Sequence, residues 1–175
     1  VDMDIRPYDG RIYKFSISMD ENPYVLNVHA KDEFPPAHTA EHLLNQVMMR
    51  MFGCGRSANA HIERKKSKMS FVLDRKPTRK EEKAIEEQMN ALIDDDLPVT
   101  FDYVDRHNLP EGVSLDRLPK DSSDTIRLVR IGDFDVCPCI GKHVRSTAQI
   151  GRFELLGTNW DQPTMTFRVR FKVHP

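Results

Sequence analysis

Hydrophobic residues alternate with polar ones along several stretches of the chain, and in two other stretches they recur every three or four positions. Alternation predicts strands with one buried face, and the longer period predicts amphipathic helices. The first helix is predicted from Ala37 to Gly53. The second is predicted from Thr78 to Ile93, because Thr78 and Glu81 have the spacing of a capping box.

Predicted strands surround these two helices. They cover residues 11–19, 24–30, 67–74, 98–105, 125–136, 150–157 and 164–173. We expect the first two to form a hairpin, so that residues 1–35 make a short N-terminal extension of a single domain spanning residues 1–175. The order of elements predicts an α+β fold with an antiparallel sheet packed against two long helices.

Composition narrows the possible environments and partners. The formal net charge is −1, so an RNA contact must come from a local basic patch and not from an overall positive field. Three cysteines, two of them separated by one residue, are too few for a disulfide framework and favour a cytoplasmic location. The first thirty residues contain no continuous apolar segment, so we expect no signal peptide and no membrane contact.

Two short motifs contain candidate metal ligands. In "HTAEHLL", His38 and His42 are four positions apart, which places them on one helix face about 6 Å apart along the axis. This pair alone also fits a surface helix with two histidines. In "CPCIGKHV", however, Cys139 and His143 add a thiolate and an imidazole, a ligand set that zinc favours, and Gly141 would let the backbone turn between them. Together the motifs predict a Zn²⁺ site between the first helix and a late strand–loop segment.

Neighbouring residues leave alternatives open. Glu41 completes an H-x-x-E-H pattern, in which a glutamate acts as general base in some zinc proteases, but it also fits a solvated carboxylate beside the metal. Cys137 could compete with Cys139 for the metal, although only Cys139 has three residues before the histidine.

The two motifs together resemble the second additional domain of alanyl- and threonyl-tRNA synthetases, and above all the alanyl editing domain and its free-standing AlaX relatives. That family has HTAxHLL, then C-x-G-x-H-V, a threonine and an Ile-Gly pair. The matching positions are His38, Thr39, Ala40, His42, Leu43, Leu44, Cys139, Gly141, His143, Val144, Thr147, Ile150, Gly151 and Phe153. The resemblance covers about residues 36–175.

Two features depart from the family pattern. Residues 57–73 lack the Gly-Ser element that often lines the editing pocket, which leaves the edited amino acid open. Only Gly10 precedes Gly53, whereas the longer AlaX forms have a Gly-rich N-terminal barrel, so the chain resembles the short free-standing type.

The resemblance implies a zinc-dependent trans-editing hydrolase, an aminoacyl-tRNA deacylase that removes serine from the alanine tRNA. The ester is already activated, so the reaction needs neither ATP nor a covalent nucleophile. Thr39 is a candidate for reading the serine hydroxyl, although its own hydroxyl could instead bond back into the first helical turn. His143 is either a permanent ligand or a catalytic group that leaves one metal position open. The protein is expected to be a monomer or a homodimer.

Contacts to tRNA are expected from Lys142, beside the second motif, and from one face of the last strand. That face carries Arg168, Arg170 and Lys172, while Phe167, Val169, Phe171 and Val173 occupy the other. Basic residues also gather in segments 63–68 and 74–80. Each cluster has a simpler interpretation as the solvated face of an antiparallel sheet or as charge on an edge strand.

Two other functional classes fit the motifs. One is an accessory module in which zinc stabilises the fold and the chain binds tRNA or a synthetase without hydrolysis. The other is a different zinc enzyme, because S-ribosylhomocysteine lyases resemble this chain in having an H-T-L-E-H helix and a later cysteine. Those enzymes use two histidines and one cysteine, so the additional His143 argues against that class.

Overall fold

The structure, a computed structural model, describes residues 2–5, 13–16, 33–116, 118 and 123–175. The helices are α1 (Pro35–Phe52) and α2 (Arg79–Asp94), with a short 3-10 turn η1 (Thr147–Ile150). The strands are β1 (Asp2–Ile5), β2 (Tyr13–Ser16), β3 (Asn59–His61), β4 (Ser67–Val72), β5 (Val99–Asp105), β6 (Thr125–Ile131), β7 (Asp135–Pro138), β8 (Arg152–Asp161) and β9 (Thr166–His174). All strand pairs among the described residues are antiparallel, which confirms the α+β prediction, but in this part of the chain the strands form three sheets and not one.

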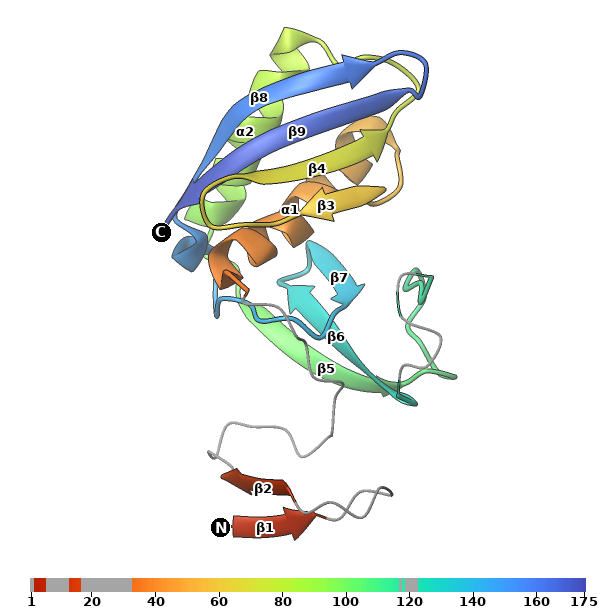
Figure 1. The fold of residues 1–175 in the computed structure, drawn as a ribbon, viewed down its shortest axis with the longest axis vertical. Coiled ribbons are helices and arrows are strands. Elements are labelled where there is room, and N and C mark those ends of the chain that lie inside the picture. Colours follow the sequence, from red (N-terminus) through yellow and green to blue (C-terminus); the bar gives the residue numbers. More distant parts are fainter. Residues whose placement is uncertain (1, 6–12, 17–32, 117, 119–122) are drawn as a thin grey trace.

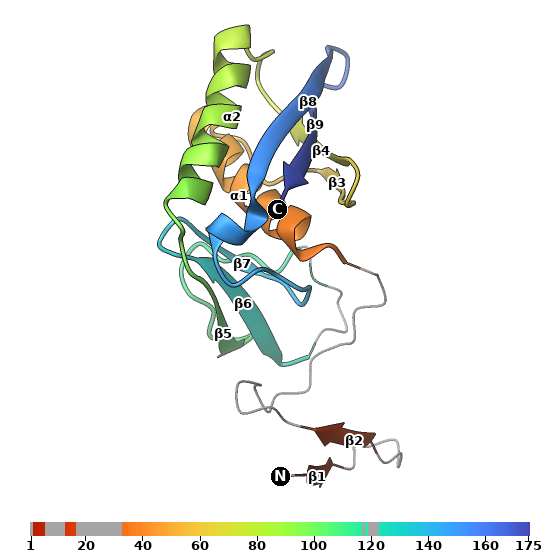
Figure 2. The same ribbon diagram turned by 90° about the vertical axis from the view of Figure 1, so that its left-hand side faces the viewer.

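The largest sheet has the strand order β3-β4-β9-β8, and both helices lie on one of its faces (Figures 1 and 2). The predicted alternation explains this packing. Met69 and Phe71 on β4 and Val169 and Phe171 on β9 are buried beneath the helices. Burial of each such side chain stabilises the folded state by roughly 1.5–3 kcal/mol. No helix of the described residues lies on the other face, which is turned toward the viewer in Figure 1.

Helix α1 begins two residues before its predicted start. Pro35 and Pro36 occupy its first turn, where the missing proline N–H costs no intrahelical bond, so these prolines open the helix as well as ending the preceding strand pattern. Gly53 ends the helix in a left-handed conformation (φ 64°) and donates to the carbonyl of Met49 at 2.9 Å. The helix therefore keeps its histidines in the first two turns, near the three-stranded sheet.

Helix α2 has the predicted capping box. The Thr78 hydroxyl accepts from the Glu81 N–H at 3.2 Å, and the Thr78 N–H donates to the Glu81 carboxylate at 2.8 Å. The buried side of α2 consists of Ile85, Met89 and Ile93, which join the core that includes α1. Among the described residues, no helix is long and apolar enough to span a bilayer.

Strands β5, β6 and β7 form the three-stranded sheet. Residues 125–136, predicted as one strand, are divided into β6 and β7 because Gly132 adopts φ 48° and turns the chain. Two hydrogen bonds then hold the segment after β7. The Cys139 N–H donates to the Arg127 carbonyl at 3.1 Å, and the Arg127 guanidinium donates to the Cys139 carbonyl at 2.7 Å. This anchoring brings the second motif beside α1.

Other elements differ from the prediction. Strand β2 falls inside predicted strand 11–19, but its described partner is β1, which the pattern did not predict. Residues 24–30, the expected partner, lie outside the described residues. Strand β3 was also missed, because its three residues are all exposed and so show no alternation.

Candidate metal centre

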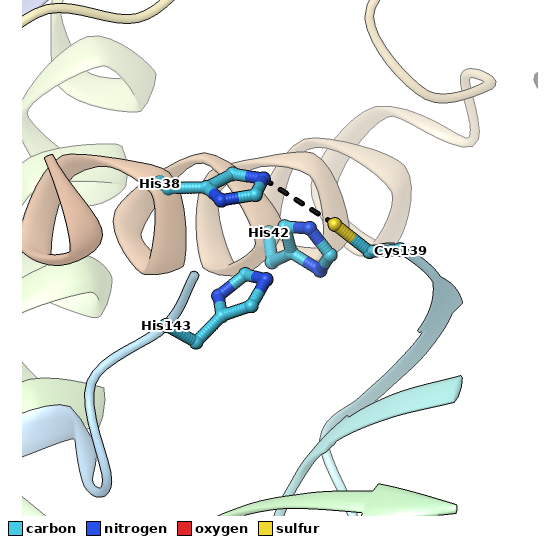
Figure 3. A group of neighbouring side chains, drawn as sticks. All are labelled: His38, His42, Cys139 and His143. Atoms are coloured by element: carbon cyan, nitrogen blue, oxygen red, sulfur yellow. Dashed lines mark hydrogen bonds between the residues drawn. The ribbon is translucent and has the colours of Figure 1, made fainter. Parts of the chain in front are cut away.

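Four side chains converge where α1 meets the segment after β7 (Figure 3). His38 and His42 come from α1, and Cys139 and His143 come from the loop, with one candidate ligand atom of each lying within 4.8 Å of the others. In a tetrahedral zinc site, such atoms are about 3.3–3.6 Å apart, so only a small contraction would close this group around an ion. Cys137 is not in the group; it lines a separate hollow with Gln46 and Arg56.

The orientation of His38 is set by a backbone carbonyl. Its Nδ1 lies 3.0 Å from the Lys142 carbonyl oxygen, which can only accept a hydrogen bond. Nδ1 must therefore carry the proton, and the lone pair of the neutral ring lies on Nε2. That atom is 3.5 Å from the Cys139 sulfur, so the side of the ring that can bind metal faces the cluster.

Thr39 sets the orientation of His143 in the same way. The Thr39 hydroxyl donates to the Pro35 carbonyl at 3.0 Å, so it can only accept from its two other partners, His143 Nδ1 at 3.0 Å and the Val144 N–H at 3.2 Å. Nδ1 of His143 thus carries the proton. Its Nε2 is buried and has no hydrogen-bond partner among the described residues, as a metal-binding atom requires.

A buried carboxylate stands behind His42. Asp135 Oδ2 is 3.8 Å from His42 Nδ1, and within the described residues neither atom has a hydrogen-bond partner. The other oxygen of Asp135 pairs with Arg56. A small approach of the two groups would let the His42 Nδ1–H donate to this carboxylate, the contact that orients a ligating imidazole in metal sites. Sequence analysis missed Asp135, because only the pairing of β7 with β6 brings it under α1.

Burial determines the protonation of the cluster. Desolvation, with His38 and Arg127 nearby, lowers the pKa of His143 to about 2, and desolvation with His143 nearby lowers the pKa of His42 well below its ordinary value. Both rings are therefore neutral at pH 7, the state in which imidazole binds metal. Burial raises the pKa of the Cys139 thiol to about 11, so a bound cation would have to displace its proton.

Gly141 is required by the close approach of two segments. A Cβ at this position would collide with the His38 ring, coming within 2.8 Å of Nδ1 and 2.6 Å of a Glu33 carboxylate oxygen. Glu33 also accepts from the Lys142 N–H and so ties the loop to the start of α1. The sequence suggested a turning role for this glycine, whereas the structure adds a steric one.

The other candidate residues are distributed unevenly around this centre. Glu41 has a carboxylate oxygen 3.9 Å from His38 Nε2, and Lys142 is exposed on the same loop as Cys139 and His143. Thr39 is fully buried, with its hydroxyl bonded back to the first helical turn.

The basic residues of β9 lie elsewhere. Arg168 and Arg170 are exposed and Lys172 is half-buried on the sheet face opposite the helices. The predicted alternation of β9 is confirmed, but these three residues are not part of the metal centre.

Comparison with known proteins agrees with this geometry. Residues 126–169 match the family described as the threonyl and alanyl tRNA synthetase second additional domain. The chain is 33% identical over 131 residues to an alanine–tRNA ligase of Halorubrum lacusprofundi, a match that covers 73% of this chain and 14% of that protein. It is 33% identical over 122 residues to the alanyl-tRNA editing protein AlaX-L of Pyrococcus horikoshii, covering 68% of this chain and 29% of that protein.

The chain thus spans less than a third of the length of either relative. The family match includes Cys139 and His143, the two candidate ligands that the loop contributes to the cluster. From the motifs, the four-residue cluster and these matches, we conclude that the chain belongs to the AlaX-like family of alanyl-tRNA editing domains.

Proposed function

We propose that the protein is a zinc-dependent deacylase that hydrolyses the ester of mischarged tRNA, with serine on the alanine tRNA as its substrate. We further propose that residues 1–175 act as one editing domain in the cytoplasm, where tRNA is charged. The reaction needs no ATP, because the aminoacyl ester is already activated. The relatives named as an alanine–tRNA ligase and an alanyl-tRNA editing protein support the choice of tRNA.

The observation that carries the proposal is the shared direction of the ligand atoms. His38 and His143 are each held by a hydrogen bond at Nδ1, so both turn Nε2 toward the cluster. Two histidines and a cysteine would suffice for the lyase class, but His143 adds a fourth donor. A complete set of four nitrogen and sulfur donors favours a tetrahedral zinc site.

We assign roles around this centre by position. When bound, zinc would anchor the substrate as a fifth ligand of the tetrahedral site or, were His143 to leave it, act as a Lewis acid in the open position. Glu41, beside His38, would accept a proton from the water that attacks the ester carbonyl. The bond from that carbonyl carbon to the ribose oxygen then breaks, and the proton passes to the ribose oxygen. Lys142 would contact a phosphate near the end of the tRNA.

Thr39 contributes by holding His143 in place. Reading the serine hydroxyl directly would require the Thr39 hydroxyl to leave one of its three buried hydrogen bonds. We therefore propose that discrimination depends on other groups beside the metal centre. An apolar pocket alone separates side chains that differ by a hydroxyl only weakly, so a polar contact to serine is needed.

The test is the rate of deacylation of serine on the alanine tRNA, measured with and without added zinc. Correctly charged alanine on the same tRNA is the matched substrate control, and the His38→Ala, Cys139→Ala double variant is the blank. We expect fast loss of serine, slow loss of alanine, and no loss above the spontaneous rate in the variant.

Other outcomes would identify the alternatives. Equal loss of serine and alanine would contradict the proposed specificity, and hydrolysis of serine only from the threonine tRNA would reassign the substrate. Binding of tRNA with its ester left intact would contradict the enzyme and support an accessory module. An absence of both binding and hydrolysis, together with lyase activity, would support the other zinc enzyme class.

A further inference from the structure

The sheet face without helices contains a hollow of about 960 Å³. Its outward side chains form two rows that run across the four strands. One row contains His61 on β3, Lys68 on β4, Arg170 on β9 and Gly157 on β8, and the other contains Asn59, Ser70, Arg168 and Asn159 in the same strand order. Lys76, from the segment that leads to α2, extends the basic lining. The hollow is thus a continuous surface of cations and hydrogen-bond donors.

The arrangement of these cations destabilises the sheet. Lys68 pairs directly with Arg170 across β4 and β9, and like charges in opposite positions are destabilising. No Asp or Glu lines the hollow, and within the described residues Lys68, Arg168 and Arg170 form no ion pair. His61, at the edge, is held by Glu63. This positive charge, which no acidic side chain neutralises, indicates that an anionic partner binds here.

Lys172, the third basic residue predicted on this strand, is not part of the hollow. It pairs across the sheet with Glu154, and no hollow residue comes from that end of β9. The surface therefore uses Arg168 and Arg170 but excludes Lys172.

The shape of the arginines suits a nucleic acid backbone. Arg170 extends over Gly157, where an added Cβ would lie 2.8 Å from a guanidinium nitrogen, so the glycine leaves room for the guanidinium to lie across β8. Guanidinium groups bind phosphate oxygens through paired hydrogen bonds. Asn59, Ser70 and Asn159 add neutral donors of the kind that position an RNA backbone.

Two aromatic rings line the hollow, and both already have partners. His61 pairs with Glu63, while Trp160 packs against the core and donates its indole N–H to Gln162 at 2.8 Å. Proteins that bind single strands stack bases on aromatic rings, whereas helical RNA is bound through its phosphates and ribose hydroxyls. With both rings engaged in the protein, the cations and neutral donors of the hollow favour a helical segment.

A basic turn joins this face to the metal centre. Residues 63–66, between β3 and β4, include three cations, and the Arg64 guanidinium lies 4.1 Å from the centre of the Phe34 ring. Phe34 precedes α1, whose first two turns carry His38 and His42. One RNA could therefore follow a positive path from the sheet face, around this turn, to the cluster.

We propose that the outer face of the β3-β4-β9-β8 sheet binds the phosphates of a helical segment of tRNA while the aminoacylated end enters the metal centre. The identity of the RNA rests on the proposed function. The surface itself is argued from charge, register and composition.

The experiment measures the binding of alanine tRNA that carries no amino acid, at KCl concentrations between 50 and 200 mM. The test variant is Lys68→Gln, Arg170→Gln, and the matched control is Lys80→Gln, Lys83→Gln, which removes two charges from α2. We expect the test variant to bind at least about tenfold more weakly and to lower the slope of log K against log salt by about two, because two phosphate contacts are lost. The control should bind as the wild type does.

Thermal unfolding provides the folding check. Both test substitutions relieve the like-charge pair, so the variant should unfold at no lower temperature than the wild type. Lys68→Glu would face Arg170 with the opposite charge, and we expect it to be folded and to lose tRNA binding.

Several results would overturn the inference. These are wild-type affinity and salt slope in the test variant, retained binding in Lys68→Glu, or equal binding of a single-stranded RNA of the same length. Because no amino acid is attached to this tRNA, the binding result does not depend on hydrolysis. Binding through this face without deacylation would contradict the proposed function alone, and deacylation with no effect of these substitutions would contradict this inference alone.

Discussion

Thr39 and Gly141 illustrate how single residues shape the candidate metal centre without contributing a ligand atom to it. The Thr39 hydroxyl has one donor and two acceptor sites, and all three are used by Pro35, His143 and Val144. Gly141 contributes by having no side chain where the His38 ring passes. Both residues act on the position of a histidine, so their effects should appear first in metal affinity.

Substitution of Thr39 by valine should weaken zinc binding about 10- to 100-fold, because His143 loses the acceptor that orients its ring. The half-buried Val144 N–H also loses its partner, so the free energy of unfolding of the zinc-free protein should fall by about 1 kcal/mol. Competition with a chromophoric chelator and urea unfolding measure the two effects. Thr39→Ser keeps the hydroxyl and serves as the control; equal zinc affinity in the valine and serine variants would contradict the assigned role.

Substitution of Gly141 by alanine should displace either the His38 ring or the loop, and overpacking of this kind typically costs about 1–3 kcal/mol. We expect roughly 10- to 100-fold weaker zinc binding with the overall secondary structure retained. Gly55→Ala is the matched control, because a Cβ there meets nothing within 4 Å. Zinc content after dialysis measures the binding, and circular dichroism measures the secondary structure. Normal zinc binding by Gly141→Ala would contradict the steric role, because the loop would then have moved without disturbing the site.

At the scale of elements, α2 is stabilised at its start by local polar contacts. Glu81 accepts from the Thr78 N–H and from both terminal nitrogens of Arg75, at 2.8 and 2.6 Å. These contacts, with the Arg75 hydrogen bond foremost, lower the pKa of Glu81 to about 2. The helix start is therefore a local feature with its own dependence on pH.

This pKa predicts how Glu81→Gln changes with pH. In the unfolded chain a glutamate has a pKa of about 4.3. The folded state therefore gains stability from the ionised Glu81 above that pH and loses it as the pH falls toward 2. The stability difference between wild type and variant should be constant from pH 8 to 6 and shrink between about pH 5 and 2. Urea unfolding at each pH measures it. In an Arg75→Gln background the pH dependence should be smaller; an unchanged dependence there would contradict the role of Arg75.

At the scale of the whole molecule, the ligand cluster connects parts that are distant in sequence. His38 and His42 belong to the helix beneath the four-stranded sheet, whereas Cys139 and His143 follow the last strand of the three-stranded sheet. A metal bound by all four would therefore join the two sheets through α1. Its removal should loosen the contact between them and not only empty a surface site.

Chelation of zinc should accordingly lower the thermal stability of the protein. A ligand present at about a thousand times its dissociation constant stabilises the folded state by about 4 kcal/mol, and this contribution is lost when the ligand is removed. Calorimetry with and without chelator measures the shift. The His38→Ala, Cys139→Ala variant should show none, and an equal melting temperature of the wild type in both conditions would contradict a folded-state metal site.

Much of the fold could be predicted from local pattern. The helices around residues 37–53 and 78–93 were recognised because their buried positions recur at helical spacing, and β9 was recognised because Phe167, Val169 and Phe171 alternate with basic residues. The division of residues 125–136 at Gly132 was missed, since apolar and polar residues continue to mix on both sides of this glycine.

Local pattern along the chain was enough to predict the two helices, the alternating strands and the four candidate ligands, because spacing along a helix or strand is a local property. Three further features follow from tertiary contacts: the placement of Asp135 behind His42, the use of Thr39 to orient His143, and the separation of Arg168 and Arg170 from the metal centre. Each of these depends on which strands pair and which face a helix covers. Such contacts join residues far apart in the chain, and no local spacing encodes them.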